Sequence, residues 1–295
     1  MKAVVFLCVV ASLAVPRHEA FGQAIGSQKA REPEEEKATT PPAPVQTYAT
    51  SELDRTIEKL PPNFNGHDIA LVYSAFEERK KESEKSEFET TEQWHQRQAA
   101  LLLKPIIGRM TAGSIWAFKI VDVRSVYDAD NQVLHVYVPL HEVRSSAGLA
   151  SNFRSMWAKF KSTDSSYVCT NGFGATAEVQ NTRYTIHHVA FGNAQAFPTV
   201  PTVEVKDGDL STVAIHVSVP SEPDAARQMK PELSALAVGR LTAPFTTSLY
   251  YGDTATVSSP YATQNQGNCV MTELLEIWIY DRNSGVIHAK VRPHD

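Results

Sequence analysis

The chain has 295 residues, with 28 lysines and arginines against 33 aspartates and glutamates, and a formal net charge of −5. Proteins that bind nucleic acid generally present a basic surface, so this composition argues against a nucleic-acid-binding function. The length suffices for one large domain or two small ones, each able to bury a hydrophobic core.

The first 24 residues have the pattern of a cleavable export signal. Lys2 supplies a positive charge, and residues 3–15 form an uncharged run rich in Val, Leu and Phe. This run is shorter than the roughly 20 apolar residues that span a bilayer, and no later stretch of the sequence is apolar enough to do so. We expect cleavage after Ala24 and a soluble periplasmic or extracellular product. The alternatives are a buried N-terminal helix and a retained anchor.

Residues 25–50 are rich in Glu, Pro and Thr and contain few apolar side chains. A segment of this composition cannot bury enough apolar surface to offset the entropy lost on ordering. We therefore predict a disordered tether, or a disordered leader with no role of its own.

Residues 51–112 are predicted to be helical. Apolar side chains recur at helical spacing in residues 53–60, which predicts a short amphipathic helix, and again in residues 69–76, which predicts a second. A third helix is expected to begin at Thr90, with Gln93 as its capping-box partner. The second and third helices together predict an αα-hairpin.

Residues 113–295 are predicted to form an antiparallel β-rich domain. Residues 133–140 and 212–219 alternate between apolar and polar side chains, which is typical of half-buried strands. The pattern at 149–160 is compatible with a short helix, and a helix is predicted at 223–237. Strands and helices do not alternate regularly, so a parallel doubly wound sheet is not expected.

The sequence thus predicts an α+β fold, in which N-terminal helices precede a mostly antiparallel β region that contains one further helix. The domain boundaries follow from this order. Residues 51–112 form a helical segment and residues 113–295 a β-rich domain, or residues 51–295 form one domain.

Two cysteines, Cys169 and Cys269, lie outside the export signal. An even pair in an oxidising compartment predicts one disulfide, which would close a loop of about 100 residues and stabilise the fold by about 4–5 kcal/mol. The alternative is two separate buried thiols. Cysteines this far apart lack the paired spacing of a zinc site.

The sequence contains no recognised motif for a nucleophilic serine, a zinc protease or a phosphate-binding loop, so it identifies no catalytic residue, and we predict no metal ligand or cofactor. Three polar residues stand out weakly. Glu276 lies among apolar and aromatic residues of an expected strand, where a carboxyl pKa can be raised, although an edge or rim position is the more common explanation. His187 and His188 are neighbours in an expected strand and must point to opposite faces.

Three tyrosines mark a candidate binding loop. Tyr250, Tyr251 and Tyr261 lie within or beside a polar stretch, residues 252–268, that is rich in Thr, Ser, Gln and Asn. Long loops without secondary structure are often functional, and the alternative is a mobile insertion.

These features predict a non-enzymatic envelope or secreted binding protein whose partner is a protein or a component of the cell envelope. The alternatives are a secreted hydrolase of glycan or peptide, and a small-molecule carrier with an apolar cavity in the β region. An apolar patch on a sheet would favour the binding protein. A cleft with two carboxylates, or a His–carboxylate pair, would favour the hydrolase.

Overall fold

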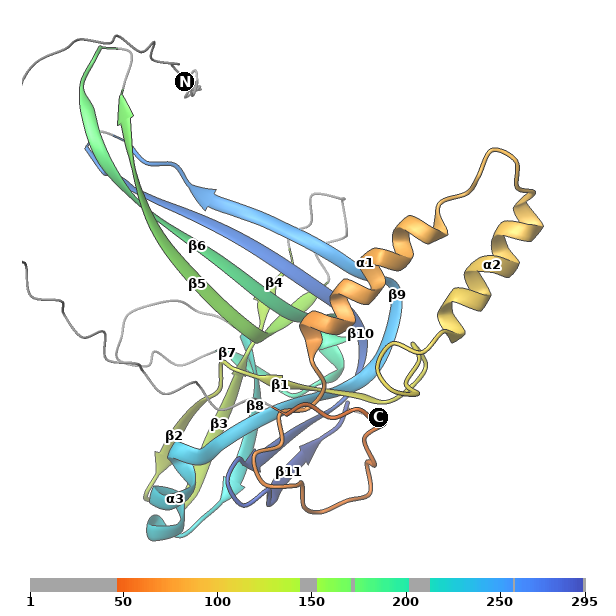
Figure 1. Ribbon diagram of the computed structural model, residues 1–295. Helices are drawn as coiled ribbons and strands as arrows, with labels where there is room; N and C mark the ends of the chain where they lie inside the picture. Colours follow the sequence, from red (N-terminus) through yellow and green to blue (C-terminus); the bar gives the residue numbers. More distant parts are fainter. Residues whose placement is uncertain (1–46, 144–152, 171–172, 202–212, 257, 294–295) are drawn as a thin grey trace, which may run out of the picture.

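The computed structural model describes residues 47–143, 153–170, 173–201, 213–256 and 258–293 (Figure 1). The structure is mostly β, with 52% strand and 18% helix. The predicted export signal at residues 1–24 lies outside the described residues, as do residues 25–46 of the predicted tether.

A large sheet forms the centre of the molecule. Its strands are β1 (Trp116–Ile120), β4 (His141–Glu142), β5 (Arg154–Thr170), β6 (Thr176–Phe191), β9 (Leu233–Asp253), β10 (Tyr261–Asp281) and β11 (Ile287–Val291). They are ordered β1-β9-β10-β6-β5-β4, with β11 beside β10. Neighbours pair antiparallel except β6 and β10, which are parallel.

A second, smaller sheet packs beside the first. Its strands are β2 (Arg124–Asp128), β3 (Val133–Pro139), β7 (Thr199–Pro201) and β8 (Val213–Pro220), in the order β2-β3-β8-β7, and all pairs are antiparallel. In β3, Leu134, Val136 and Val138 are buried while the residues between them are partly exposed. The predicted strands at 133–140 and 212–219 are therefore confirmed.

The chain between the parallel strands β6 and β10 makes a long crossover, as a parallel pair requires. It passes through β7, β8, the short helix α3 (Pro223–Met229) and β9. The helix predicted over 223–237 is too long. A 3₁₀ turn at Lys230–Glu232 follows α3, and β9 begins at Leu233. Pro231 has no backbone N–H with which to continue the helical hydrogen bonds.

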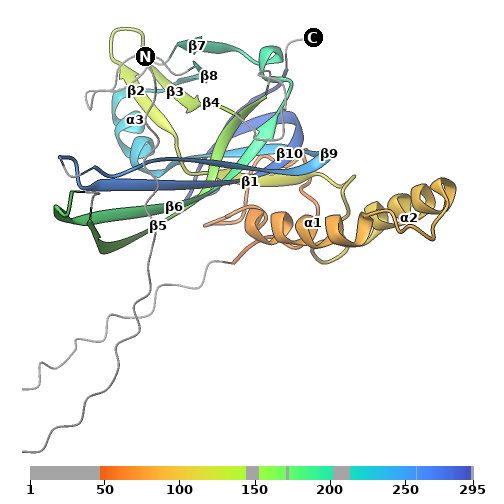
Figure 2. The ribbon, with the colours of Figure 1, turned by 90° about the horizontal axis from the view of Figure 1, so that it is seen from above.

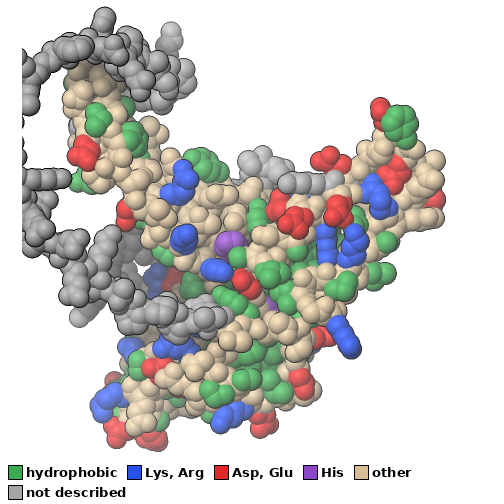
Figure 3. Space-filling model, viewed as in Figure 1, with side chains coloured by type: hydrophobic (Ala, Val, Ile, Leu, Met, Phe, Trp, Pro, Cys, Tyr) green, Lys and Arg blue, Asp and Glu red, His purple; other side chains and the backbone are tan. Residues whose placement is uncertain are grey.

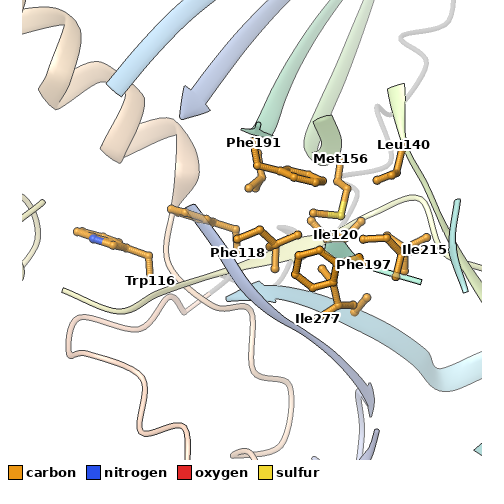
Figure 4. Close-up of a cluster of buried hydrophobic side chains, with 14 of the residues drawn as sticks. Trp116, Phe118, Ile120, Leu140, Met156, Phe191, Phe197, Ile215 and Ile277 are labelled. Carbon is orange, nitrogen blue, oxygen red and sulfur yellow. The ribbon is translucent and has the colours of Figure 1, made fainter. Parts of the chain in front are cut away.

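The main hydrophobic core combines side chains of both sheets and of the first helix (Figure 4). The large sheet contributes Phe118, Phe191 and Ile277, and the small sheet contributes Ile215 from β8. Complete burial of a side chain of this size stabilises the fold by about 2–3 kcal/mol relative to exposure. The two sheets therefore depend on each other for their stability.

Residues 47–66 cover the opposite face of β1, β9 and β10 without forming a helix, so the helix predicted at 53–60 is wrong. Leu53 and Leu60 are buried there, in a second cluster with Trp278 and Tyr280. Several backbone N–H groups of this segment donate hydrogen bonds to neighbouring elements. The N–H of Leu60, for example, donates to the carbonyl oxygen of Gly285 at 2.8 Å.

Two longer helices form an arm that projects from one side of the large sheet (Figures 1 and 2). They are α1 (Ile69–Ser83) and α2 (Thr91–Leu103). The first turns of α1 insert Ile69, Val72 and Phe76 into the main core. The capping box at Thr90 and Gln93 is confirmed. Within the described part of the chain, no helix has the length and apolar character needed to cross a membrane.

The predicted α+β fold class is wrong, because the structure is mostly β, with three α-helices among the described residues, and an N-terminal αα-hairpin is not shown. The helices predicted around residues 69–76 and from Thr90 are present as α1 and α2. The strands are longer than the sequence indicated. Strand β5 includes most of the helix expected at 149–160, and β9 and β10 together include most of the loop expected at 252–268. The helices are therefore additions to a large sheet. The strands of this sheet continue beyond the residues that alternate between apolar and polar side chains.

Gly285 tests the connection between the β10–β11 turn and residues 47–66. Its φ is +76°, and a Cβ at this position would overlap the carbonyl oxygen of Leu60. We expect Gly285→Ala to lower the free energy of unfolding by about 3 kcal/mol, measured by urea denaturation. The control is Gly113→Ala, where a Cβ meets no atom within 4 Å. Equal midpoints for the two variants would contradict this packing.

Candidate functional site: a blade of four long strands

The ends of β5, β6, β9 and β10 extend past the main hydrophobic core as a four-stranded blade (Figures 1 and 2). The blade comprises residues 159–170, 176–187, 246–253 and 261–268. Its cross-strand register is unbroken, so Lys161, Thr185, Gln266 and Tyr250 lie side by side in one row. Because successive residues of a strand point to opposite faces, the register assigns each residue to one of two faces.

One face of the blade, here called the basic face, carries its positive charges. Lys159 and Lys161 of β5 and Arg183 of β6 lie on it, in register rows that include no Asp or Glu among the described residues. Tyr167 and Tyr250 share this face. The other positions are mainly Thr, Ser, Gln and Asn, which leaves a polar surface with a net positive charge.

The opposite face, here called the acidic face, carries the negative charges. Asp164 of β5, Glu178 of β6 and Asp253 of β9 lie on it, and within the described blade its rows contain no Lys or Arg. Phe160 and Tyr261 share this face. The strand register thus separates the charges of the blade completely by sign.

Aromatic side chains are exposed on both faces. Tyr250 on the basic face is 74% exposed, and Tyr261 on the acidic face is 67% exposed. Tyr167 and Phe160 are also exposed. Tyrosine offers both an apolar ring and a polar hydroxyl, which is why it is enriched where proteins bind partners.

A pocket of about 420 Å³ lies at the foot of the basic face, next to the start of α1. Three lysines, Lys119, Lys159 and Lys161, and one aspartate, Asp68, contribute to its lining. Lys159 pairs with Asp68 at 3.2 Å, while Lys119 donates a hydrogen bond to the Asn65 side chain. Burial lowers the pKa of Lys119, with a contribution from Arg282. Figure 3 shows basic side chains on the lower part of the blade, beside α1.

Glu276 lies at the other end of β10, outside the blade, and its side chain has no contact with solvent. Arg55 and Arg292 donate to Oε1 at 2.6 and 2.9 Å, and the Trp278 indole N–H donates to Oε2 at 2.6 Å. Burial raises the pKa of Glu276, but these hydrogen bonds outweigh it and lower the pKa. The expected raised pKa is wrong, and Glu276 is not placed to donate a proton.

His187 and His188 point to opposite faces of β6, as expected, and they do not form a common site. His187 meets Tyr73 of α1 edge-on and hydrogen-bonds to Asn268. His188 is buried on the other face, where Ser155 Oγ lies 3.1 Å from its Nδ1. Burial lowers the pKa of His188 to about 3, and the neighbouring histidines contribute.

The predicted disulfide is wrong, because Cys169 and Cys269 lie far apart on the sheet. Cys169 pairs with Ala177 of β6, whereas Cys269 pairs with His188 of the same strand. At about 3.3 Å per residue, that interval along β6 spans roughly 36 Å. A disulfide requires Cα atoms within about 7 Å. Burial raises the pKa of the Cys269 thiol to about 12.

The tyrosines predicted on a loop lie on strands instead. Tyr250 and Tyr251 belong to β9, and Tyr261 is the first residue of β10. The loop predicted at 252–268 is therefore wrong, since these strands are separated only by residues 254–260. Two of the three tyrosines are nevertheless exposed on the blade, in the rows described above.

The basic residues of the blade were not identified from the sequence. Lys159 and Lys161 stand on either side of Phe160 in the sequence, and Arg183 stands between Thr182 and Tyr184. Because alternate residues of a strand share a face, this spacing places the two lysines on the same face. This alternation was not recognised because residues up to 160 were interpreted as a helix.

Comparison of the chain with protein-family models, with curated proteins and with solved structures finds no match.

Glu276 is expected to stabilise the fold. Because its folded-state pKa is lowered, this stabilisation is complete above the ordinary carboxyl value of 4.5 and is lost as the pH falls through the folded pKa. We expect Glu276→Gln to lower the free energy of unfolding at neutral pH by about 2 kcal/mol, a value reduced because both arginines reach solvent. Asp224→Asn, which breaks an exposed ion pair, is the control. Denaturation curves that coincide for these variants would contradict the prediction.

The imidazole of His188 is expected to stay neutral well below the ordinary histidine pKa of 6.5, because burial lowers its pKa to about 3. Its ring proton resonances, followed by NMR from about pH 8 to about pH 5, should therefore not titrate. A midpoint near the ordinary value would show that the ring reaches solvent.

Proposed function

We propose that this protein is an exported, non-enzymatic binding protein whose blade holds a component of the cell envelope. The observation that carries the proposal is the exposure of Tyr250 and Tyr261 on strands that continue past the main hydrophobic core. Ordering each backbone residue costs about 1–2 kcal/mol, and the blade part of β5, which is exposed from Phe160 to Val168, recovers little of this by burial. Core stability does not explain why the four strands continue as a blade, whereas a binding role does.

The shape of the blade favours a large or extended partner over a small molecule. Its faces are broad rows of side chains across four strands, and they combine tyrosines with hydroxyl and amide groups. Surfaces of this composition bind partners through many modest contacts around a few aromatic residues. The hydrolase alternative is weakened because both carboxylate oxygens of Glu276 are occupied by hydrogen-bond donors.

A location outside the cytoplasm is part of the same proposal. Its support is the pattern of residues 1–24, a positive charge followed by a short apolar run and small residues before the expected cleavage position. A cell-envelope partner agrees with that location.

The proposal predicts that aromatic residues of the blade are needed for binding to envelope material. Tyr250→Ser and Tyr261→Ser remove one tyrosine from each face. We expect wild type to co-sediment with purified cell-envelope fragments, and at least one of these variants to bind about tenfold more weakly. The control is Phe88→Ser on the helical arm, where the side chain is 90% exposed.

The measurement is the fraction of protein that sediments over a range of fragment concentrations, with thermal unfolding as a check on folding. If both tyrosine variants sediment like wild type and like Phe88→Ser, or if wild type does not sediment, the blade is not an envelope-binding surface.

A further inference from the structure

We infer that the basic face of the blade, together with the pocket at its foot, binds an acidic glycan, a polysaccharide that carries carboxylate groups. This inference rests on the proposed function and names the chemistry of the partner.

The first step is the separation of charge on the blade. The chain as a whole is acidic, yet Lys161 and Arg183 lie on a face whose described rows hold no carboxylate. Neither residue forms an ion pair within the described part of the chain. Lys161 and Arg183 occupy adjacent rows of the same face, so they offer two neighbouring positive charges to an external anion.

The second step is the positioning of these charges. The Nε and Nη2 atoms of Arg183 donate to the side-chain oxygen of Gln264 on β10 at 3.2 and 3.1 Å. These bonds hold the guanidinium over the sheet and leave Nη1 available. A guanidinium fixed in this way recognises carboxylate oxygens at a smaller entropic cost than a freely moving side chain.

The third step is the chemistry between the charges. Thr163, Thr185 and Gln266 share the basic face with Lys161 and Arg183 and offer hydroxyl and amide groups that both donate and accept hydrogen bonds. Sugar hydroxyls require such mixed partners. A nucleic acid carries a charge on every nucleotide and depends on a dense basic surface, which three cations along twelve-residue strands do not supply.

The pocket at the foot completes the surface. Its volume of about 420 Å³ lies in the range of sites that hold small molecules. Lys119, Lys159 and Lys161 outnumber Asp68 in its lining, and Tyr48 supplies a ring beside them. A carboxylate-bearing sugar at the end of a chain fits this combination of positive charge and aromatic wall. The remaining sugars would then follow the blade toward Tyr250.

The test compares polymers of different chemistry on the full chain. Polygalacturonate is the acidic glycan, a neutral glucan of similar length is its uncharged counterpart, and oligo-dT and polyglutamate represent the other anionic classes. The variants are Lys161→Gln, Arg183→Gln and their combination. Arg227→Gln is the control, since Arg227 lies on α3 in an exposed ion pair.

We expect wild type to prefer polygalacturonate over the glucan, with an affinity that falls as salt is added. Each blade variant should weaken this binding about threefold and the double variant about tenfold, while the control keeps wild-type affinity. The measurement is titration calorimetry at two salt concentrations.

Other outcomes overturn the inference. They are equal binding of the neutral glucan, binding of oligo-dT or polyglutamate as strong as that of polygalacturonate, no binding of polygalacturonate, and blade variants that bind like the control. In each case the proposed function is judged separately. It survives if Tyr250→Ser or Tyr261→Ser still weakens sedimentation with envelope fragments, and it fails if neither does.

Discussion

The hydrogen-bonded pairing of β10 with β6 on one side and β9 on the other holds the molecule together. One end of this 21-residue strand lies in the main core, through side chains such as Val270 and Ile277, and the other end forms the middle of the blade. The core fixes the register of the pairing, because a shift by one residue would turn every buried side chain toward the wrong face. The same register then determines which residues share a face of the blade.

The two ends of β10 therefore differ in chemistry. At the core end, Glu276 is enclosed by Arg55, Arg292 and Trp278, and this network attaches residues 47–66 to the sheet. At the blade end, the polar groups face solvent and the cations of the basic face have no carboxylate in their rows among the described residues. Breaking a buried, hydrogen-bonded charge network destabilises the fold, whereas the exposed charges of Lys161 and Arg183, which form no ion pair among the described residues, remain available to a partner.

Sequence patterns predicted the elements that bury one face. Residues 133–140 alternate between apolar and polar side chains because one side of β3 packs in the core, and Thr90 with Gln93 forms a capping box within four residues of chain. The blade strands were misread because polar residues occupy most positions on both of their faces. Ser, Thr, Gln and Asn then occupy successive positions, and no apolar alternation distinguishes residues 252–268 from a loop.

By itself, the sequence determined the overall acidity, the helix cap and the strands with one apolar side, since each depends on composition or on near neighbours in the chain. Tertiary structure alone decided the length of the blade, the separation of its charges and the separation of Cys169 from Cys269. It also decided the environment of Glu276, whose partner Arg55 is 221 residues away. These properties arise from pairing between distant segments, and no local pattern encodes which strands become neighbours.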